Sequence, residues 1–174
     1  FFNYKQQNNF TTFPKPSTDS IYIKKNKLTP IGNGKFKLIE DKNNFGKSKI
    51  MQGNINAVFM LTKACMPLLR NSPSASIIMT SSSVGKQGRA FWGPYAVSKF
   101  ATEGLVQVLA DELDGSTIRV NAINPGATRT KMRAKAFPAE DKYSLKTPEQ
   151  IAPLYLYLMG NDSKDIHGQS LNAQ

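Results

Sequence analysis

The sequence lacks the features of several common classes of protein. Its single cysteine, Cys65, cannot form an internal disulfide, and its apolar helical setting predicts a buried, inert thiol. No run approaches the roughly 18 apolar residues of a membrane span. The first 30 residues contain no arginine and no apolar core segment, so neither a secretory signal nor a transit peptide is recognisable. We therefore expect a cytoplasmic protein without a membrane partner.

Metal-binding and phosphate-binding motifs are also missing. The only histidine, His167, has no metal-ligand partner, so no metal site is predicted and the ring is expected at the surface. Neither G-x-x-x-G-x-G nor G-x-G-x-x-G, the turns that cradle a dinucleotide pyrophosphate, occurs. Ile31–Gly34 has two glycines but no third, and is interpreted as a turn.

The positive charge is concentrated in residues 1–50. These carry ten lysines against three acidic residues, a net charge of +7 out of +11 for the whole chain. Lysines mixed with aromatic residues are one pattern of nucleic-acid binding. The alternative, a solvated or disordered lysine-rich segment, is favoured, so nucleic acid is not the expected partner. The segment is predicted to have weak strands at Ser20–Lys24 and Lys35–Ile39.

From Met51 onward, helical and strand patterns alternate. Apolar residues at helical spacing predict helices, and the continuous run Ile77–Met79 predicts a strand buried on both faces. This order predicts an α/β fold with parallel strands, right-handed crossovers and helices on both faces of the sheet. The predicted elements are helices at 51–69 and 94–113, strands at 74–81 and 117–123, and a helix that begins at a capping box over Thr147–Gln150.

Chemistry is predicted around residues 81–99. Tyr95 and Lys99 stand four apart, which places both side chains on one face of a helix. An ammonium beside a phenol favours the phenolate, so such a tyrosine can exchange a proton with a hydroxyl or carbonyl oxygen. Ser82, at the end of the preceding strand, can hydrogen-bond the same oxygen. By itself Y-x-x-x-K is a weak signal, because most such pairs are surface residues of helices.

Three further motifs accompany this pair. They are S-S-x-x-G before it, N-I-N-A-V-F around Asn54, and N-P-G-A-T-R-T from Asn124. In this combination the chain resembles the short-chain dehydrogenase/reductase family, and within it a group of bacterial oxidoreductases. The resemblance covers about residues 51 to 172 and does not extend to residues 1–50.

The resemblance implies an oxidoreductase that transfers a hydride between NAD or NADP and a carbonyl or alcohol substrate. The implied catalytic residues have distinct roles. Tyr95 would give or take the proton, and Lys99 would favour its phenolate and bind the nicotinamide ribose. Ser82 would hold the substrate oxygen, and Asn54 would support a proton relay to solvent. A helix-start cap is the alternative for Asn54.

The resemblance also implies where the cofactor and substrate lie. The loop that begins at Asn124, after the strand predicted at 117–123, would run along the nicotinamide and bind its carboxamide. An ordinary strand-to-loop turn remains an alternative. The Gly85–Gly93 loop would wall the substrate site, although its Trp92 could equally pack against a neighbour. Residues 131–146 are interpreted as a mobile substrate loop. The choice between NAD and NADP cannot be read. The implied cofactor-binding residues are Tyr95, Lys99, Pro125, Gly126, Thr128 and Thr130.

The implied fold is a Rossmann-like doubly wound parallel sheet, of which residues 51–174 form the C-terminal catalytic half. Its N-terminal half is missing or replaced by residues 1–50, and a chain that begins at Phe1 suggests a fragment. An inactive, truncated remnant that cannot bind cofactor is therefore the alternative function. A homodimer or homotetramer is implied, because in the family the helices that carry Asn54 and Tyr95 build the subunit contact.

Overall fold

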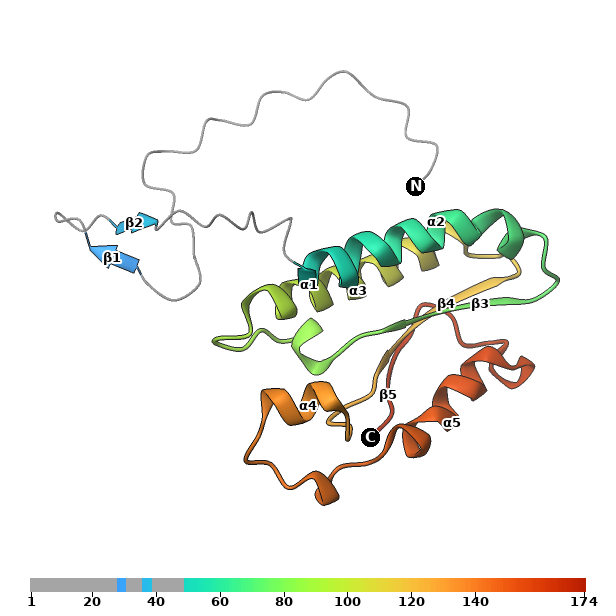
Figure 1. Ribbon diagram of the computed structural model, residues 1–174. Helices are drawn as coiled ribbons and strands as arrows, with labels where there is room; N and C mark the ends of the chain where they lie inside the picture. The colour runs from blue at the N-terminus through green and yellow to red at the C-terminus, as the bar shows by residue number, and fades with distance from the viewer. Residues whose placement is uncertain (1–27, 31–35, 39–48) are drawn as a thin grey trace. The chain divides into compact units, whose positions relative to one another are not determined.

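The computed structural model describes residues 28–30, 36–38 and 49–174. The chain divides into two units, Phe1–Lys47 and Ser48–Gln174. The second unit contains every residue singled out above for chemistry, and Figure 1 shows its helices and sheet.

In the first unit, the described residues form two short strands. β1 (Leu28–Pro30) pairs antiparallel with β2 (Phe36–Leu38). β2 lies within the weak strand predicted at Lys35–Ile39, which is thereby confirmed. The strand predicted at Ser20–Lys24 and the turn at Ile31–Gly34 lie outside the described residues.

The second unit begins with one helical stretch that contains a wider turn. α1 (Lys49–Met51) leads into a π-helical turn at Gln52–Asn56, which continues as α2 (Ala57–Arg70). The backbone stays right-handed helical on both sides of this turn, so the predicted helix at 51–69 is confirmed. Single π-turns inside α-helices occur frequently at functional sites, and this one contains Asn54.

Three parallel strands form the sheet, in the order β3-β4-β5. Ala75 of β3 lies opposite Ile118 of β4, and Ala122 of β4 opposite Ser170 of β5. Figure 1 shows α2 and α3 on one face of the sheet and α5 on the other, which confirms the doubly wound parallel fold. The elements are β3 (Ala75–Thr80), α3 (Gly93–Glu112), β4 (Ile118–Asn124), α4 (Lys131–Ala136), α5 (Pro148–Met159) and β5 (Ser170–Asn172).

The main core lies between the sheet and the pair α2–α3. On α3 the apolar residues at helical spacing are only partly covered: Leu109 is buried and Leu105 packs on the core, whereas Val108 is 42% exposed. Two polar side chains, Thr102 and Glu103, also take core-facing positions. The core residues are Met66, Ala75, Met79, Val106, Leu109, Ala110, Leu113, Ile118, Val120 and Ala122.

β4 is buried on both faces, although its apolar residues alternate along the strand with polar ones. Arg119 donates from Nη1 to the Gly160 carbonyl and to Ser163 Oγ, and Asn121 donates from Nδ2 to the Ile166 carbonyl. His167 is also half-buried rather than on the surface: its Nδ1 accepts from the Val120 amide and its Nε2 contacts the Ala110 carbonyl at 2.8 Å. These polar groups tie the loops to the central strand.

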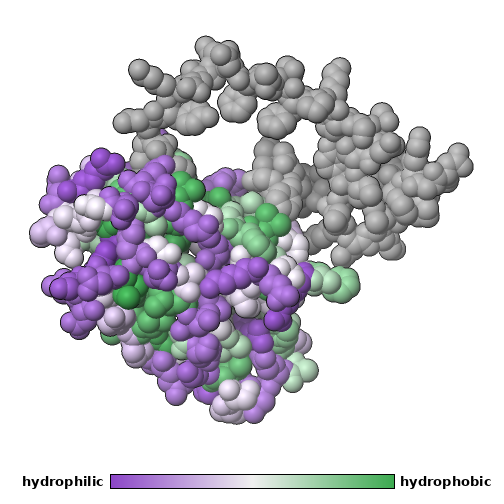
Figure 2. Space-filling model, turned by 180° about the vertical axis from the view of Figure 1, so that it is seen from behind, coloured by the Kyte–Doolittle hydropathy of each residue, from purple (hydrophilic) through white to green (hydrophobic). Residues whose placement is uncertain are grey.

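The outer surface of α2 and α3 carries many apolar side chains. Figure 2 shows hydrophobic surface interrupting the hydrophilic surface on one face of the molecule. Leu68 is 74% exposed and Phe100 46% exposed. None of the helices in the described part of the chain combines the length and apolar character needed to cross a membrane. The large apolar residues exposed on these two helices are Met60, Leu61, Leu68, Val97, Phe100 and Val108.

Candidate active site

The predicted tyrosine–lysine pair lies in the first two turns of α3. Pro94 occupies the first helical turn, where its missing N–H costs nothing. The Lys99 ammonium lies 5.7 Å from the centroid of the Tyr95 ring and donates to the Thr80 carbonyl at 2.8 Å. Burial lowers the pKa of Lys99 from its ordinary value, because it disfavours the charged form. The Lys99 amino group is therefore held between Tyr95 and the end of β3.

Asn54 reaches this pair through a serine. Its Nδ2 donates to Ser98 Oγ at 2.9 Å, and Ser98 Oγ donates to the Tyr95 carbonyl at 2.7 Å. Helical residues precede Asn54, so it does not cap a helix start, and that alternative is excluded. Ser98, which is completely buried, was not predicted as a site residue. The available signal was its position three residues after Tyr95, on a neighbouring helical face.

Ser82 lies where β3 ends and a 3-10 turn, Ser83–Gly85, begins. The Ser81 amide donates to the Ile123 carbonyl at 2.7 Å, which keeps this end of β3 in register with β4. The turn packs tightly on α3, because a Cβ at Gly85 would lie 2.8 Å from the Lys99 carbonyl oxygen. Ser82 is therefore fixed at the carboxyl edge of the sheet, beside the helix that carries Tyr95.

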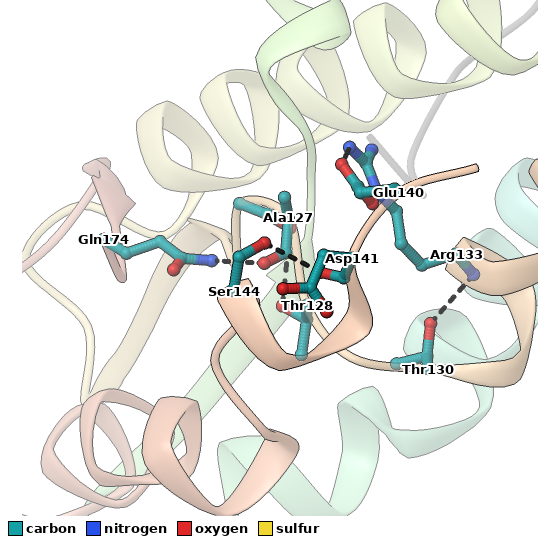
Figure 3. A network of polar contacts seen from close by, with 9 residues as sticks. Ala127, Thr128, Thr130, Arg133, Glu140, Asp141, Ser144 and Gln174 are labelled. Carbon is teal, nitrogen blue, oxygen red and sulfur yellow. Dashed lines mark hydrogen bonds and ion pairs between the residues drawn. The ribbon is translucent and has the colours of Figure 1, made fainter. Parts of the chain in front are cut away.

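The predicted cofactor loop follows β4 at the same edge. Gly126 has a φ of 70°, which favours glycine. Gln174 Nε2 donates to the carbonyls of Pro125 at 2.7 Å and Ala127 at 3.0 Å. Figure 3 shows the Gln174 side chain pointing at this loop. The loop thus presents carbonyl oxygens that bind a primary carboxamide.

Two threonines of this loop already have structural partners. Thr130 Oγ1 accepts from the Arg133 amide at 3.1 Å and so caps α4. Thr128 forms an isolated bridge with Lys146, and its hydroxyl lies 3.4 Å from the Pro125 carbonyl oxygen. A hydroxyl that accepts one bond still carries its own proton. Thr130 can therefore cap the helix and donate to a ligand.

Aromatic residues form one wall next to Tyr95. The Trp92 ring centroid lies 5.8 Å from that of Tyr95 and 5.9 Å from that of Phe137. Trp92 therefore packs against neighbouring rings, which was the alternative for this residue.

An ion pair supports this wall. The Arg133 guanidinium lies 3.8 Å from the Phe137 ring centroid and bonds both carboxylate oxygens of Glu140, at 2.6 and 2.5 Å (Figure 3). This hydrogen bonding holds the pKa of Glu140 below its ordinary value. Residues 131–146, interpreted from the sequence as a mobile substrate loop, thus contain α4 and an ion pair between Arg133 and Glu140.

A groove runs between α2 and the edge of β3 and has a volume of about 430 Å³. Asn54 and Lys99 both line it, as does Cys65, which is half-buried rather than buried as predicted. Among the described residues, β3 pairs only with β4, so its other edge faces this groove. Two candidate catalytic residues therefore border an open edge of the sheet.

The sheet is parallel, is covered by helices on both faces and gathers polar side chains at its carboxyl edge. These features define a doubly wound α/β protein. The short chain dehydrogenase family matches residues 31–141. This range is more than half of the chain, and the chain belongs to that family. The sequence resemblance was expected to start at about residue 51, whereas the family match already begins at residue 31.

The chain aligns with only about half of each similar protein. The Escherichia coli K12 oxidoreductase YciK is 62% identical over 125 residues, which are 72% of this chain and 49% of YciK. A short chain dehydrogenase from Shigella flexneri 2a, solved with NADP, has a TM-score of 0.69 and 62% identity, over 71% of this chain and 52% of that one. An Escherichia coli CFT073 dehydrogenase solved with NADPH gives the same TM-score and identity, over 71% and 51%. The chain thus spans about half the length of the relatives it matches.

Proposed function

We propose that the chain carries the catalytic half of an NADP-dependent oxidoreductase that interconverts a carbonyl and an alcohol. The single observation that carries this proposal is the linked arrangement of Asn54, Ser98, Tyr95 and Lys99 at the carboxyl edge of the sheet. Family membership supports the reaction class, and the NADP and NADPH complexes of proteins with 62% identity favour NADP over NAD.

In this proposal Tyr95 exchanges a proton with the substrate oxygen. The Lys99 ammonium, held by the Thr80 carbonyl at 2.8 Å, stabilises negative charge on the phenol. Ser82 donates a hydrogen bond to the same substrate oxygen and stabilises charge that develops there. Asn54 fixes the backbone of Tyr95 through Ser98 and, with its remaining polar atoms, supports proton exchange with solvent.

The residues present fit the nicotinamide end of the cofactor. The carbonyls of Pro125 and Ala127 already accept from the carboxamide of Gln174, and nicotinamide carries the same group. We therefore propose that Pro125, Gly126, Thr128 and Thr130 position the nicotinamide. Once bound, the cofactor supplies the hydride chemistry. No sequence motif of this chain provides the glycine-rich cradle for its pyrophosphate.

A second candidate is the same fold without cofactor binding. Its support is the missing glycine-rich turn, together with a chain that spans about half of its relatives. In this case the site residues are in place but cannot meet a cofactor. Turnover by the chain alone is accordingly expected to be weak or absent.

The test compares the full chain with a chimera in which the N-terminal half of YciK precedes residues 51–174. NADPH oxidation is followed with a panel of ketones and aldehydes, and NADP reduction with secondary alcohols. The chimera should turn over, and Tyr95→Phe should lower its kcat by about 100-fold or more. A chimera that binds NADPH and turns over equally well without the Tyr95 hydroxyl contradicts the assignment. A chimera that neither binds nor turns over favours the inactive remnant.

Self-association is a further part of the proposal. Exposed apolar side chains on α2 and α3, such as Leu68 and Phe100, leave these helices poorly covered in a monomer. They support a homodimer or homotetramer that buries this face, which sedimentation analysis would detect. Phe100→Glu should then favour the monomer. A small-molecule carbonyl or alcohol as the substrate and a cytoplasmic location complete the proposal.

A further inference from the structure

Glu103 is a buried carboxylate to which the proposed reaction assigns no task. It lies on α3 and is only 7% exposed. The hydroxyls of Ser81 and Ser170 both donate to its Oε1, the second at 3.0 Å. One carboxylate oxygen thus joins three elements: α3, the end of β3 and the start of β5.

These contacts lie beside the candidate catalytic residues. Glu103 is four residues after Lys99 and eight after Tyr95, so all three lie along one side of α3. Ser81 immediately precedes Ser82. The bond from Ser81 to Glu103 therefore connects the helix that carries Tyr95 to the strand end that carries Ser82.

Two further contacts converge on the same place. A Cβ at Gly85 would lie 2.8 Å from the Lys99 carbonyl oxygen and 2.9 Å from Ser81 Oγ, so the turn after Ser82 is pressed against both. Lys86 Nζ donates to the Ser170 carbonyl at 3.3 Å. The turn is thereby fixed to α3 on one side and to β5 on the other.

We propose that Glu103 is a positioning residue, which sets the location of Ser82 relative to Tyr95 and Lys99 through its bonds to Ser81 and Ser170. An apolar side chain in this place would avoid the cost of burying a carboxylate. Unlike an apolar side chain, the carboxylate accepts hydrogen bonds from both serine hydroxyls at one oxygen, and these directional bonds fix where the two serines lie. This inference rests on the proposed function for the importance of Ser82, but the geometry it describes does not depend on cofactor.

Hydrogen exchange of the full chain, without cofactor, tests the proposal. The reporters are the amides of Ser81, Gly85 and Gln87, which donate to the carbonyls of Ile123, Ser82 and Ser83. The reference is the Ala75 amide at the other end of β3, which donates to the Thr117 carbonyl. Glu103→Ala should speed exchange of the reporters about tenfold and leave Ala75 within about threefold.

Three variants separate positioning from general stability. Glu103→Gln retains an oxygen that accepts both hydroxyls, so it should restore reporter exchange to within about threefold of the wild type. Ser81→Ala, the smaller change if Glu103→Ala does not fold, should speed the same amides. Ser163→Ala removes an equally buried hydroxyl at the Arg119 end of β4 and should leave the reporters unchanged.

Three outcomes would overturn the proposal. They are unchanged reporter exchange in Glu103→Ala and Ser81→Ala, an equal rise at Ala75, or a failure of Glu103→Gln to restore the reporters. Because no cofactor is present, a negative result here is separate from failure of the proposed oxidoreductase function. Equally, a chimera that is inactive while these amides respond as expected would contradict the function and leave the positioning role intact.

Discussion

The link from Asn54 to Tyr95 through Ser98 leads to a quantitative prediction. The Ser98 hydroxyl is completely buried, accepts from Asn54 at 2.9 Å and donates to the Tyr95 carbonyl at 2.7 Å. Each such neutral hydrogen bond contributes roughly 0.5–1.5 kcal/mol net to stability. Ser98→Ala should therefore lower the free energy of unfolding by about 1–3 kcal/mol. With a urea m-value of roughly 1–3 kcal/mol/M, the midpoint should fall by about 1 M.

A double-mutant cycle isolates the shared bond. Asn54→Ala and Ser98→Ala each remove the same contact, so their effects on unfolding should be non-additive by about 0.5–1.5 kcal/mol. The matched control combines Asn54→Ala with Ser163→Ala, a second completely buried serine, which bonds Arg119 of the central strand β4. That pair should add to within about 0.3–0.5 kcal/mol. A coupling between Asn54 and Ser98 no larger than this control would refute the link.

The remaining predictions concern the turn, the lysine and the ion pair. Gly85→Ala should destabilise the fold by about 1–3 kcal/mol, because the added Cβ meets the Lys99 carbonyl. In Gly104→Ala the added Cβ has no atom within 4 Å, so this variant should be more stable than the wild type by about 0.5–1 kcal/mol. Equal effects of the two substitutions on urea unfolding would contradict the close packing at Gly85. Burial lowers the pKa of Lys99 below its unfolded value of 10.5, so at a pH between the folded and unfolded pKa the unfolded state binds more protons. The stability of the wild type relative to Lys99→Met should therefore rise as pH increases through that range. A difference in stability that stays constant with pH would be inconsistent with a buried ammonium. The lowered pKa of Glu140 means that its pair with Arg133 stabilises above the ordinary value of 4.5 and is lost as pH falls through the lowered value. Emission of Trp92, the only tryptophan, should change in that acid range through Phe137, and Glu140→Gln should abolish the change.

Local signals in the sequence predicted the elements well. Pro94 and Gly115, the latter with a φ of 70°, bound α3 as expected, and the Thr147–Gln150 capping box begins α5. These signals act within a few residues, so they can be read without knowing the fold. The parallel sheet was predicted from the order of the elements. The resemblance of the chain to the short chain dehydrogenase family is confirmed by the family match.

Non-local polar contacts could not be predicted from pattern. Glu103 and Ser98 were assigned no role, because a polar residue in a helix is ordinarily placed on the solvent side. Their partners Ser81 and Asn54 lie 22 and 44 residues away. The burial of Arg119 was not predicted for the same reason, since its acceptor at Gly160 is 41 residues distant. Such burial depends on which segments the fold brings together.

The central claim is that residues 51–174 hold a complete catalytic group that needs only a bound cofactor. The most direct measurement is single-turnover kinetics of the chimera with the N-terminal half of YciK, comparing the wild-type sequence with Tyr95→Phe. We expect the variant to bind NADPH within about threefold of the wild type and to lose about 100-fold or more of the hydride-transfer rate. Equal rates in the two proteins, with NADPH bound to both, would contradict the claim.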